Sequence, residues 1–473
     1  MTRQIYHRDT EDTERLLGRR SLDSVIGLNW KRATRNRKSE TRFFSLCTLC
    51  LCGYFLFGVT RAGATTQQVV PVDGAAFSAE LVSIAVDGNV TFRVSVKGDP
   101  VVIKSGDLVR WGNPVPPKPQ TLVVLADGGW LVTAADWSGG AAVRLNGDDV
   151  LVLSDTWDEI RLPRSLVSGI VFAQRSRTDE RERLAERVRD EPSSGSVLQG
   201  KGVATADSVL LTNGDRLTGT LATLESGSLT LQSAAGEAKL PLARVEAIVF
   251  GTRPSSVVRR PVPDGESFSG PSRNGRGILV GTRDGSLLFA RAIEATEVKV
   301  AIELTNGVKL TGGKVEDIVA LQLLGGPFEY LSDLERADYR FVPYLSIAWP
   351  LARDRNVLGG PLTVDGKRYS KGLGLHSAAR VTYPFDRDYQ RFDATVALDD
   401  AAKGRGSVVF GAYVLRDGKW AEAYKGGAMR GGESPQPVSV DLHGAKGLTL
   451  TVDYADRGDE LDYADWLDAR LVR

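Results

Sequence analysis

The chain has 473 residues, of which 42% are apolar and 25% charged, an ordinary globular composition with enough length for two or three hydrophobic cores. Its net charge is +1, but residues 1–42 hold 11 Lys and Arg against 6 Asp and Glu, so the rest of the chain is mildly acidic. That remainder shows no basic stripe, which argues against a nucleic-acid-binding protein.

A long apolar run follows the basic N-terminal extension of residues 1–42. The run, Phe43–Val59, has 17 residues and is followed by the small-residue site Ala62–Ala64. A basic flank, an apolar centre and an Ala-x-Ala site are typical of a secretory signal peptide, so we predict one at residues 43–64, cleaved after Ala64. The predicted location is secreted, periplasmic or cell envelope. The alternatives are an uncleaved membrane anchor, because 17 residues is near the lower limit of a membrane span, and a translation start further downstream.

The three cysteines, Cys47, Cys50 and Cys52, all lie inside this apolar run. A chain cleaved after Ala64 therefore has no cysteine, which excludes a disulfide framework and a cysteine metal site. Its stability must come from its hydrophobic cores.

From Gln67 to about Gly325 the sequence predicts short β-strands. Alternating runs such as Val90–Val96 are separated by Asp-Gly, Asn-Gly and Gly-Gly pairs, which hairpin turns require. A strand–turn–strand pattern recurs in this region, at Leu125–Leu131, Leu211–Leu217 and Gly281–Leu287.

A second motif recurs further along each of these units. Ile160–Phe172 and Ala238–Phe250 align position for position around Leu-Pro and Ile-Val-Phe, and Gly313–Val319 is a weaker third copy. We predict three small β-meander or barrel modules, structural or adhesive rather than catalytic, because they hold no histidine and no shared carboxylate pair. They resemble the "nGDrLxGxL" strand repeats of exported bacterial proteins. The predicted boundaries are residues 65–173, 208–252 and 277–332.

Two linkers separate these modules. Residues 174–207 are predicted to form a charged, solvated helix, because Arg and Glu side chains recur at i, i+3 and i+4. Residues 253–276, rich in Pro, Ser and Gly, form the second predicted linker. The narrow apolar seam of the helix consists of Leu184, Ala185 and Val188.

The common catalytic signatures Gly-x-Ser-x-Gly, His-Glu-x-x-His and Gly-x-x-x-x-Gly-Lys-Ser/Thr do not occur in the sequence. Beyond residue 64 there are two histidines, His376 and His443, from which a multi-histidine zinc site or a triad would be hard to assemble. Glycoside hydrolysis needs only two carboxylates, so an accessory or cryptic glycoside hydrolase stays open as an alternative.

Two motifs dominate the C-terminal part. Lys371–His376 has glycine at alternate positions, which suggests a strand or bend that approaches a neighbour closely. Asp462–Asp468 places three carboxylates around Trp466. An aromatic ring beside acceptor groups suits a neutral polyol, although a tryptophan is also a common core residue.

Together with Arg368–Ser377, Arg391–Asp400 and Leu448–Val452, these motifs resemble the NPCBM-type carbohydrate-binding module over residues 333–473. The resemblance implies a jelly-roll β-sandwich of the galactose-binding-like kind, usually attached to exported sugar-active proteins. Members of the family often have histidine where this chain has Tyr463, so the sequence departs from the family pattern at that position.

We predict that loops at one rim of this sandwich bind a neutral, galactose-like glycan. The predicted sugar-contacting residues are Trp349, His376, Asp462 and Trp466. No cofactor is expected, except that acidic turn residues can hold Ca²⁺ through oxygen ligands. The candidate calcium ligands are Asp399, Asp400 and Asp459.

The sequence therefore favours an exported, all-β, non-catalytic carbohydrate-binding protein, with a C-terminal jelly-roll sandwich preceded by repeated β-meander or barrel modules. Its expected partner is a glycan or polysaccharide, and an envelope protein bound through the β repeats is a second expected partner. A structural envelope protein that uses the sandwich for protein contacts is a further alternative. Membrane contact is expected only if the signal is not cleaved.

Overall fold

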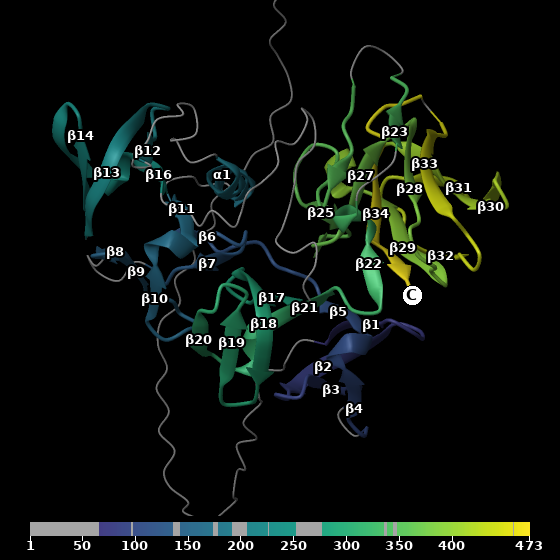
Figure 1. The fold of residues 1–473 in the computed structure, drawn as a ribbon, viewed down its shortest axis with the longest axis horizontal. Helices are drawn as coiled ribbons and strands as arrows, with labels where there is room; N and C mark the ends of the chain where they lie inside the picture. The colour runs from purple at the N-terminus through teal and green to yellow at the C-terminus, as the bar shows by residue number, and fades with distance from the viewer. Residues whose placement is uncertain are drawn as a thin grey trace, which may run out of the picture. The chain divides into compact units, whose positions relative to one another are not determined.

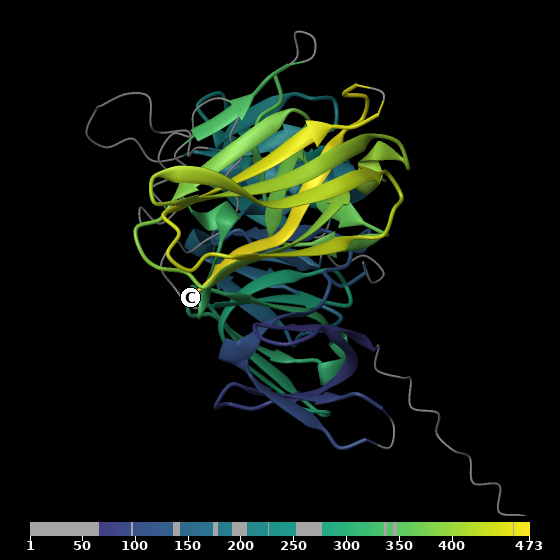
Figure 2. The same cartoon turned by 90° about the vertical axis from the view of Figure 1, so that its right-hand side faces the viewer.

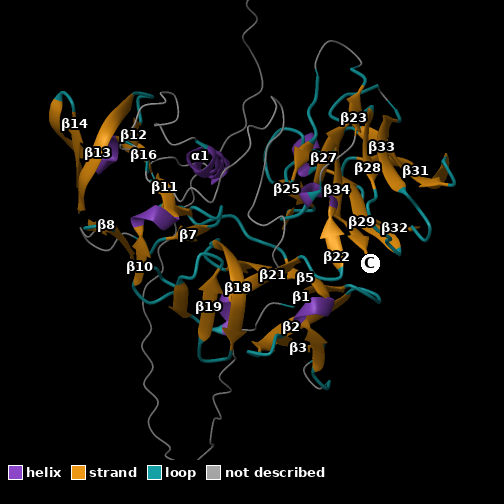
Figure 3. Cartoon of the chain, viewed as in Figure 1, coloured by secondary structure: helices purple, strands orange, loops and turns teal. Residues whose placement is uncertain are grey.

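The structure is a computed structural model that describes residues 66–95, 98–135, 142–173, 178–191, 206–225, 227–251, 277–334, 338–343, 348–456 and 458–473. The predicted signal peptide and the second predicted linker lie outside the described residues. Nearly all the described secondary structure is β, which confirms the predicted all-β fold class (Figure 1 and Figure 3). Among the described residues, no helix is long and apolar enough to cross a membrane.

The described part of residues 66–324 contains four β units of one design, where the sequence pattern predicts three. In each unit the last strand pairs antiparallel with the first. A short 3₁₀ turn always precedes that last strand. We number these units 1 to 4 in chain order.

Unit 1 holds β1 (Gln67–Pro71), β2 (Phe77–Ile84), β3 (Asn89–Arg93), β4 (Val101–Lys104) and β5 (Leu108–Gly112). Unit 2 holds β6 (Leu122–Leu125), β7 (Trp130–Val132), β8 (Val143–Asn146), β9 (Asp149–Val152), β10 (Ile160–Pro163) and β11 (Val167–Val171). Unit 3 holds β12 (Asp207–Leu211), β13 (Arg216–Glu225), β14 (Ser228–Ser233), β15 (Gly236–Pro241) and β16 (Val245–Val249). Unit 4 holds β17 (Gly277–Thr282), β18 (Leu287–Ala295), β19 (Val300–Leu304), β20 (Lys309–Gly312) and β21 (Ile318–Leu324).

The Leu-Pro and Ile-Val-Phe motif of the sequence is the strand, 3₁₀ turn and last strand of a unit. Pro163 and Pro241 directly precede the turns η2 (Arg164–Leu166) and η3 (Leu242–Arg244). Proline fixes its own φ and removes a donor where the ladder ends, so it marks the boundary well. Units 1 and 4 have lysine at this position, before η1 (Ser105–Asp107) and η4 (Val315–Asp317), which explains why the sequence pattern misses unit 1 and sees unit 4 only weakly.

The units associate in pairs through their last strands, β11 with β16 and β5 with β21. Each of these crossings contains a glycine. A Cβ atom on Gly169 would lie 2.1 Å from the carbonyl oxygen of Ile248, and one on Gly112 would lie 2.0 Å from that of Val319. Both distances are far below van der Waals contact, so only glycine allows the two backbones to come this close.

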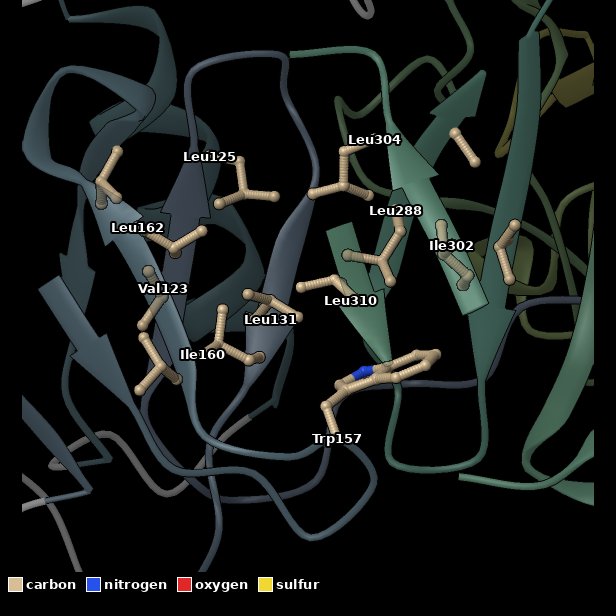
Figure 4. Packing of buried hydrophobic residues seen from close by; sticks show 14 of the residues in the cluster. Val123, Leu125, Leu131, Trp157, Ile160, Leu162, Leu288, Ile302, Leu304 and Leu310 are labelled. Atoms are coloured by element: carbon tan, nitrogen blue, oxygen red, sulfur yellow. The ribbon is translucent and has the colours of Figure 1, made fainter. Parts of the chain in front are cut away.

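One hydrophobic cluster runs through all four units. Figure 4 shows part of it, with Leu125 and Leu162 of unit 2 and Leu288 and Leu310 of unit 4 among the labelled side chains. Trp157 is 4% exposed and forms an isolated β-bridge with Gly312, which ties unit 2 to unit 4. The units therefore share a continuous core.

The predicted charged helix is α1 (Thr178–Asp190), but it is not a solvated linker. Its apolar seam packs on β6, β11 and β16. The guanidinium of Arg181 is buried. It donates hydrogen bonds of 2.6–3.1 Å to three backbone carbonyl oxygens of one loop, those of Pro117, Lys118 and Gln120. The prediction of an exposed helix is wrong because the pattern of charges does not show that one arginine caps a buried loop.

A β-sandwich follows, with its own hydrophobic core. One sheet has the order β24-β27-β34-β29-β32, with β22 paired to β34, and the other has the order β23-β28-β33-β30-β31. Because β22 precedes residue 333, the sandwich begins before the predicted boundary. Its strands are β22 (Phe328–Tyr330), β23 (Asp338–Phe341), β24 (Ala352–Arg353), β25 (Leu362–Val364), β26 (Lys367–Tyr369), β27 (Gly372–His376), β28 (Ala379–Pro384), β29 (Arg391–Leu398), β30 (Ser407–Arg416), β31 (Lys419–Arg430), β32 (Gln436–Asp441), β33 (Gly447–Tyr454) and β34 (Tyr463–Val472). The remaining short turns are η5 (Leu331–Asp333) and η6 (Asp400–Ala402).

A buried ion pair links the sandwich to unit 1. The Nε of Arg110 donates to Oδ2 of Asp468 at 2.7 Å, and both side chains are about 5% exposed. Nε2 of Gln322 donates to the other oxygen of Asp468 at 2.9 Å, and the Arg110 guanidinium lies 5.2 Å from the ring centre of Tyr369. Both carboxylate oxygens of Asp468 are thus used by the β units.

Candidate functional site

The motif Asp462–Asp468 occupies β34, in the middle of one sheet, and it is almost entirely buried. Trp466 has no exposed surface, and its ring packs against those of Phe392 and Phe410 at centroid distances of 5.8 and 5.3 Å. The structure therefore gives Trp466 the core role that the sequence left open as an alternative to sugar contact. The ring stabilises the core of the sandwich and has no surface with which to contact a sugar.

Asp462 is also inaccessible. Its Oδ2 accepts a hydrogen bond of 2.6 Å from the Ser377 hydroxyl, and its Oδ1 accepts one of 2.8 Å from the backbone N–H of Ser407. Burial raises the pKa of the Asp462 carboxyl above its ordinary value, and the two hydrogen bonds oppose that effect. The side chain holds together the loop after β27 and the start of β30, so we assign it a supporting role.

The third carboxyl of the motif, Asp465, faces Asp399. Burial, followed by the nearby charge of Asp399, raises the pKa of Asp465 well above its ordinary value. A protonated Asp465 can donate to Asp399, which also accepts hydrogen bonds from the backbone N–H groups of Thr363 and Ala401 and from the amide of Asn356. Asp399 thereby fixes β25 and the loop before it.

Trp349, His376 and Tyr463 form an aromatic group at one end of this sheet, which we call the rim cluster. The rings of Trp349 and His376 are parallel within 1° and their centres lie 4.7 Å apart. The ring of Tyr463 lies 6.0 Å from that of Trp349 and 5.9 Å from that of His376. The pairing of β27 with β34 explains this proximity, because His376 and Tyr463 are directly opposite each other in the ladder.

The hydrogen bonds of the rim cluster determine its chemistry. Nδ1 of His376 donates to the carbonyl oxygen of Ser377 at 2.8 Å, so a neutral imidazole presents Nε2 as an acceptor. The hydroxyl of Tyr339 donates to the carbonyl of Trp349 at 2.7 Å and fixes the backbone that carries the indole. His376, the inner ring of the stack, is buried, whereas Trp349 and Tyr463 are half-buried. The accessible part of the cluster is therefore made by Trp349 and Tyr463.

The polar residues that follow Trp349 in the sequence point elsewhere. Arg353 donates to the carbonyl of Ser332 at 3.3 Å, and Arg355 forms an ion pair with Glu186 of α1. Asp354 accepts a hydrogen bond of 2.7 Å from Nζ of the buried Lys371. Although these three residues closely follow Trp349 in the sequence, their contacts are with η5, α1 and Lys371 and not with the rim cluster.

The candidate calcium ligands do not converge. Asp399 is buried as described above, while Asp400 accepts hydrogen bonds of 3.1 and 2.9 Å from the backbone N–H groups of Asp365 and Gly366. Asp459 lies in the loop before β34. Among the residues that the structure describes, no group of three or more His, Cys, Asp or Glu side chains is arranged to hold a metal ion.

A cavity of about 730 Å³ lies beside the sandwich, and none of the predicted site residues lines it. Its wall includes Lys371, Arg368 and Trp130. Lys371 is paired with Asp333 and Asp354 at 2.6 and 2.7 Å, and Arg368 with Glu182 at 2.6 Å. The charges in this wall already have partners, so the rim cluster is the better candidate for the predicted sugar site.

The fold and the sequence together define the C-terminal sandwich as a module of the carbohydrate-binding class. More specifically, residues 329–472 match the NPCBM/NEW2 domain, which confirms the resemblance and moves its start four residues ahead of the predicted one.

Two curated proteins are similar to this part of the chain. A protein of Renibacterium salmoninarum named as an endo-alpha-N-acetylgalactosaminidase is 34% identical over 114 residues, which is 24% of this chain and 7% of that protein. The alpha-1,3-galactosidase B of Akkermansia muciniphila is 29% identical over 119 residues, which is 24% of this chain and 14% of that protein. The chain thus covers only a small fraction of either relative.

Two solved structures are also similar. The CBM51 module from Clostridium perfringens GH95, in complex with methyl-galactose, is 24% identical, with 31% of this chain and 99% of that chain covered and a TM-score of 0.27. The CBM51-2 and INT domains from Clostridium perfringens ZmpB, in complex with GlcNAc, are 26% identical, with 39% of this chain and 38% of that chain covered and a TM-score of 0.28.

Sequence reasoning brought Trp349 and His376 together but left out Tyr463, because tyrosine departs from the family pattern there. The strand register provides the missing signal, since Tyr463 begins the strand that pairs with Gly372–His376. Phe341, whose ring lies edge-on to His376 at 6.1 Å, was not predicted either.

Proposed function

We propose that the protein is an exported, non-catalytic carbohydrate-binding protein whose C-terminal module holds a neutral, galactose-like sugar at the rim cluster. The observation that carries this proposal is the parallel stack of Trp349 on His376 with Tyr463 beside it. The buried His376 ring supports one face of the indole, so Trp349 is held in place before any ligand arrives. A fixed aromatic ring costs little ordering entropy when it binds a ligand.

The chemistry of the cluster suits a sugar. The C–H face of a pyranose stacks on an aromatic ring, and its hydroxyls need a few well-placed polar groups. The Tyr463 hydroxyl, on the accessible part of the cluster, can both donate and accept hydrogen bonds. The names of the two curated relatives refer to enzymes that act on galactose-type sugars, and their similarity is confined to the binding module, which supports this sugar class.

The absence of the common catalytic signatures and the presence of two histidines beyond residue 64 support a non-catalytic role. The rim cluster contains no carboxylate pair, because Asp462 supports the loops from inside. We therefore place catalysis, where it is needed, in a partner enzyme.

Titration calorimetry of the chain from Thr65 onward with methyl galactoside and methyl N-acetylgalactosaminide tests the proposal. A single module of this size is expected to bind in the micromolar-to-millimolar range, about 4–8 kcal/mol. Trp349→Ala should reduce the affinity at least tenfold, and because the indole is half-buried and stacked on His376 it should also lower the melting temperature without unfolding the module, which a melting curve checks.

The matched control is His443→Ala, which removes a histidine whose side chain is 72% exposed and which lies outside the rim cluster. Its affinity should equal that of the unaltered chain. Unchanged affinity in Trp349→Ala would place the sugar elsewhere. Binding of neither glycoside by the unaltered chain would favour the structural envelope protein instead.

A further inference from the structure

The outer face of the five-stranded sheet of the sandwich carries a second ordered set of side chains. This sheet lies toward the viewer in Figure 2. Residues that are directly opposite each other in antiparallel strands share a face, so the strand register defines rows across β28, β33, β30 and β31. The three rows are Pro384, Gly447, Leu415 and Trp420; then Thr382, Thr449, Tyr413 and Glu422; then Arg380, Thr451, Gly411 and Lys425.

Trp420 lies flat on this face. Its α-carbon is two strands away from Gly447, a distance of about 10 Å. Nevertheless its Cη2 atom would be only 3.2 Å from a Cβ atom placed on Gly447. The indole must therefore extend across β30, above Leu415, with its tip resting over Gly447. Any larger residue at position 447 would push the ring off the sheet.

The ring remains open to solvent on its other side, because Trp420 is 46% exposed. An indole that lies against a sheet with one face exposed is a rigid surface on which a ligand ring can stack. A ligand that binds there does not first have to order a mobile loop. A tryptophan that only filled a core would be buried, as Trp466 is.

Hydroxyl groups continue the surface next to the indole. The hydroxyls of Thr382 and Thr449 are 2.9 Å apart, and the Tyr413 hydroxyl donates to the Glu422 carboxylate at 3.4 Å. These groups can exchange hydrogen bonds with a ligand that lies across the strands.

The charge of the face indicates which class of ligand fits. It carries three cations, Arg340, Arg380 and Lys425, and three anions, Asp338, Glu422 and Asp453. Arg380 is also paired with Asp338 at 3.2 Å. A face with balanced charges, one exposed ring and a row of hydroxyls complements a ligand that has many hydroxyls and no net charge.

We propose that this face is a second carbohydrate-binding surface, which takes a neutral polysaccharide chain lying across the strands with one sugar unit stacked on Trp420. It shares no residue with the rim cluster and does not depend on it. The rim would hold a terminal sugar, whereas the open face has no wall that limits the length of the chain.

Affinity gel electrophoresis of the chain from Thr65 onward in gels that contain galactan, mannan, xylan or dextran tests the proposal. At least one polysaccharide should retard the unaltered chain, and Trp420→Ala should weaken that retardation at least tenfold. Gly447→Val, which displaces the ring without removing it, should weaken it as well. Val298→Ala is the control, because this 83% exposed side chain lies between β18 and β19 of unit 4, outside both proposed sugar sites, and it should leave the retardation unchanged.

Each readout separates this inference from the rim site. Methyl galactoside binding should survive Trp420→Ala and should be lost in Trp349→Ala, whichever polysaccharide is bound. The competing explanation is that a second copy of the chain pairs along the edge strand β31 and covers this face. Analytical ultracentrifugation of the unaltered chain and of Trp420→Ala tests it by comparing their oligomeric states. Retardation that Trp420→Ala leaves intact, retardation by none of the four polysaccharides, or a change in oligomeric state in place of a change in binding would each overturn the proposal.

Discussion

The four β units and the sandwich are stabilised by different sets of interactions. The units are held by backbone pairing and a shared aliphatic core, and their repeated motif specifies turn geometry. The units bury only a few charged side chains, such as Asp207 and Asp284, whereas the sandwich buries more of them, among them Lys371, Asp462, Asp465 and Asp468. A motif rich in carboxylates can thus be an internal framework that positions a surface site, rather than the site itself.

The largest expected effect comes from the glycine at a unit crossing. Gly169→Ala places a methyl group 2.1 Å from the carbonyl oxygen of Ile248, so β11 and β16 must separate. We expect a loss of at least about 3 kcal/mol in the free energy of unfolding. Chemical denaturation measures it.

Gly106→Ala is the control, because nothing lies within 4 Å of the new methyl group there. It should change stability by less than about 0.5 kcal/mol. Equal stability of the two variants would show that the crossing tolerates separation and that the units are held by their core alone.

The next effect concerns the contact between the two regions. Asp468→Asn keeps the left-handed backbone of this residue, where φ is +49°, but leaves the buried Arg110 without its counter-charge. Breaking a buried pair typically costs about 3–5 kcal/mol. We expect calorimetry to show the units and the sandwich melting in separate transitions.

Asp388→Asn is the matched control, since this aspartate pairs with Lys446 on the surface and is 84% exposed. Its effect should stay below about 1 kcal/mol. A double-mutant cycle with Arg110→Met would assign the loss to the pair, and a coupling energy near zero would mean that the ion pair does not join the two regions.

The sequence anticipated these two regions unequally. It predicted the strands, the turns and the Leu-Pro boundary, because hairpin and proline signals are local. It showed Asp468 only as one of three carboxylates around Trp466, because its partner Arg110 is 358 residues away and no local pattern connects them. The sequence predicts Trp349 and His376 as sugar-contacting residues, but it does not predict that their rings stack. The register of β27 against β34 determines which rings meet at this end of the sheet.

The buried carboxyl pair in the sandwich should make the stability of this region depend on pH. The pKa of Asp465 is raised in the folded protein, so on raising the pH the unfolded chain loses this proton first, near its ordinary pKa of about 4. Above that pH the native state holds more protons, and the free energy of unfolding falls by at most about 1.4 kcal/mol per pH unit until the folded pKa is passed.

Asp465→Asn keeps a donor for Asp399 and cannot ionise. Its stability relative to the unaltered chain should therefore increase with pH from about pH 4 upward, as measured by urea unfolding at several pH values. Taking the difference between the two proteins removes the contribution of Asp462, whose pKa is also raised by burial, whereas the contribution of Asp399 stays in the difference because its titration is coupled to that of Asp465. Parallel pH curves would show that Asp465 does not stay protonated in the interior.

The smallest effect separates the surface site from the framework beneath it. Tyr463→Phe removes one half-buried hydroxyl and keeps the ring that packs beside Trp349 and His376. Stability should change by less than about 0.5 kcal/mol, whereas affinity for methyl galactoside should fall about fivefold, the equivalent of one hydrogen bond of about 1 kcal/mol. Calorimetric titration and a melting curve on the same sample give both values. A variant that loses stability but binds normally would place Tyr463 in the framework together with Asp462, and would leave Trp349 to bind the sugar without it.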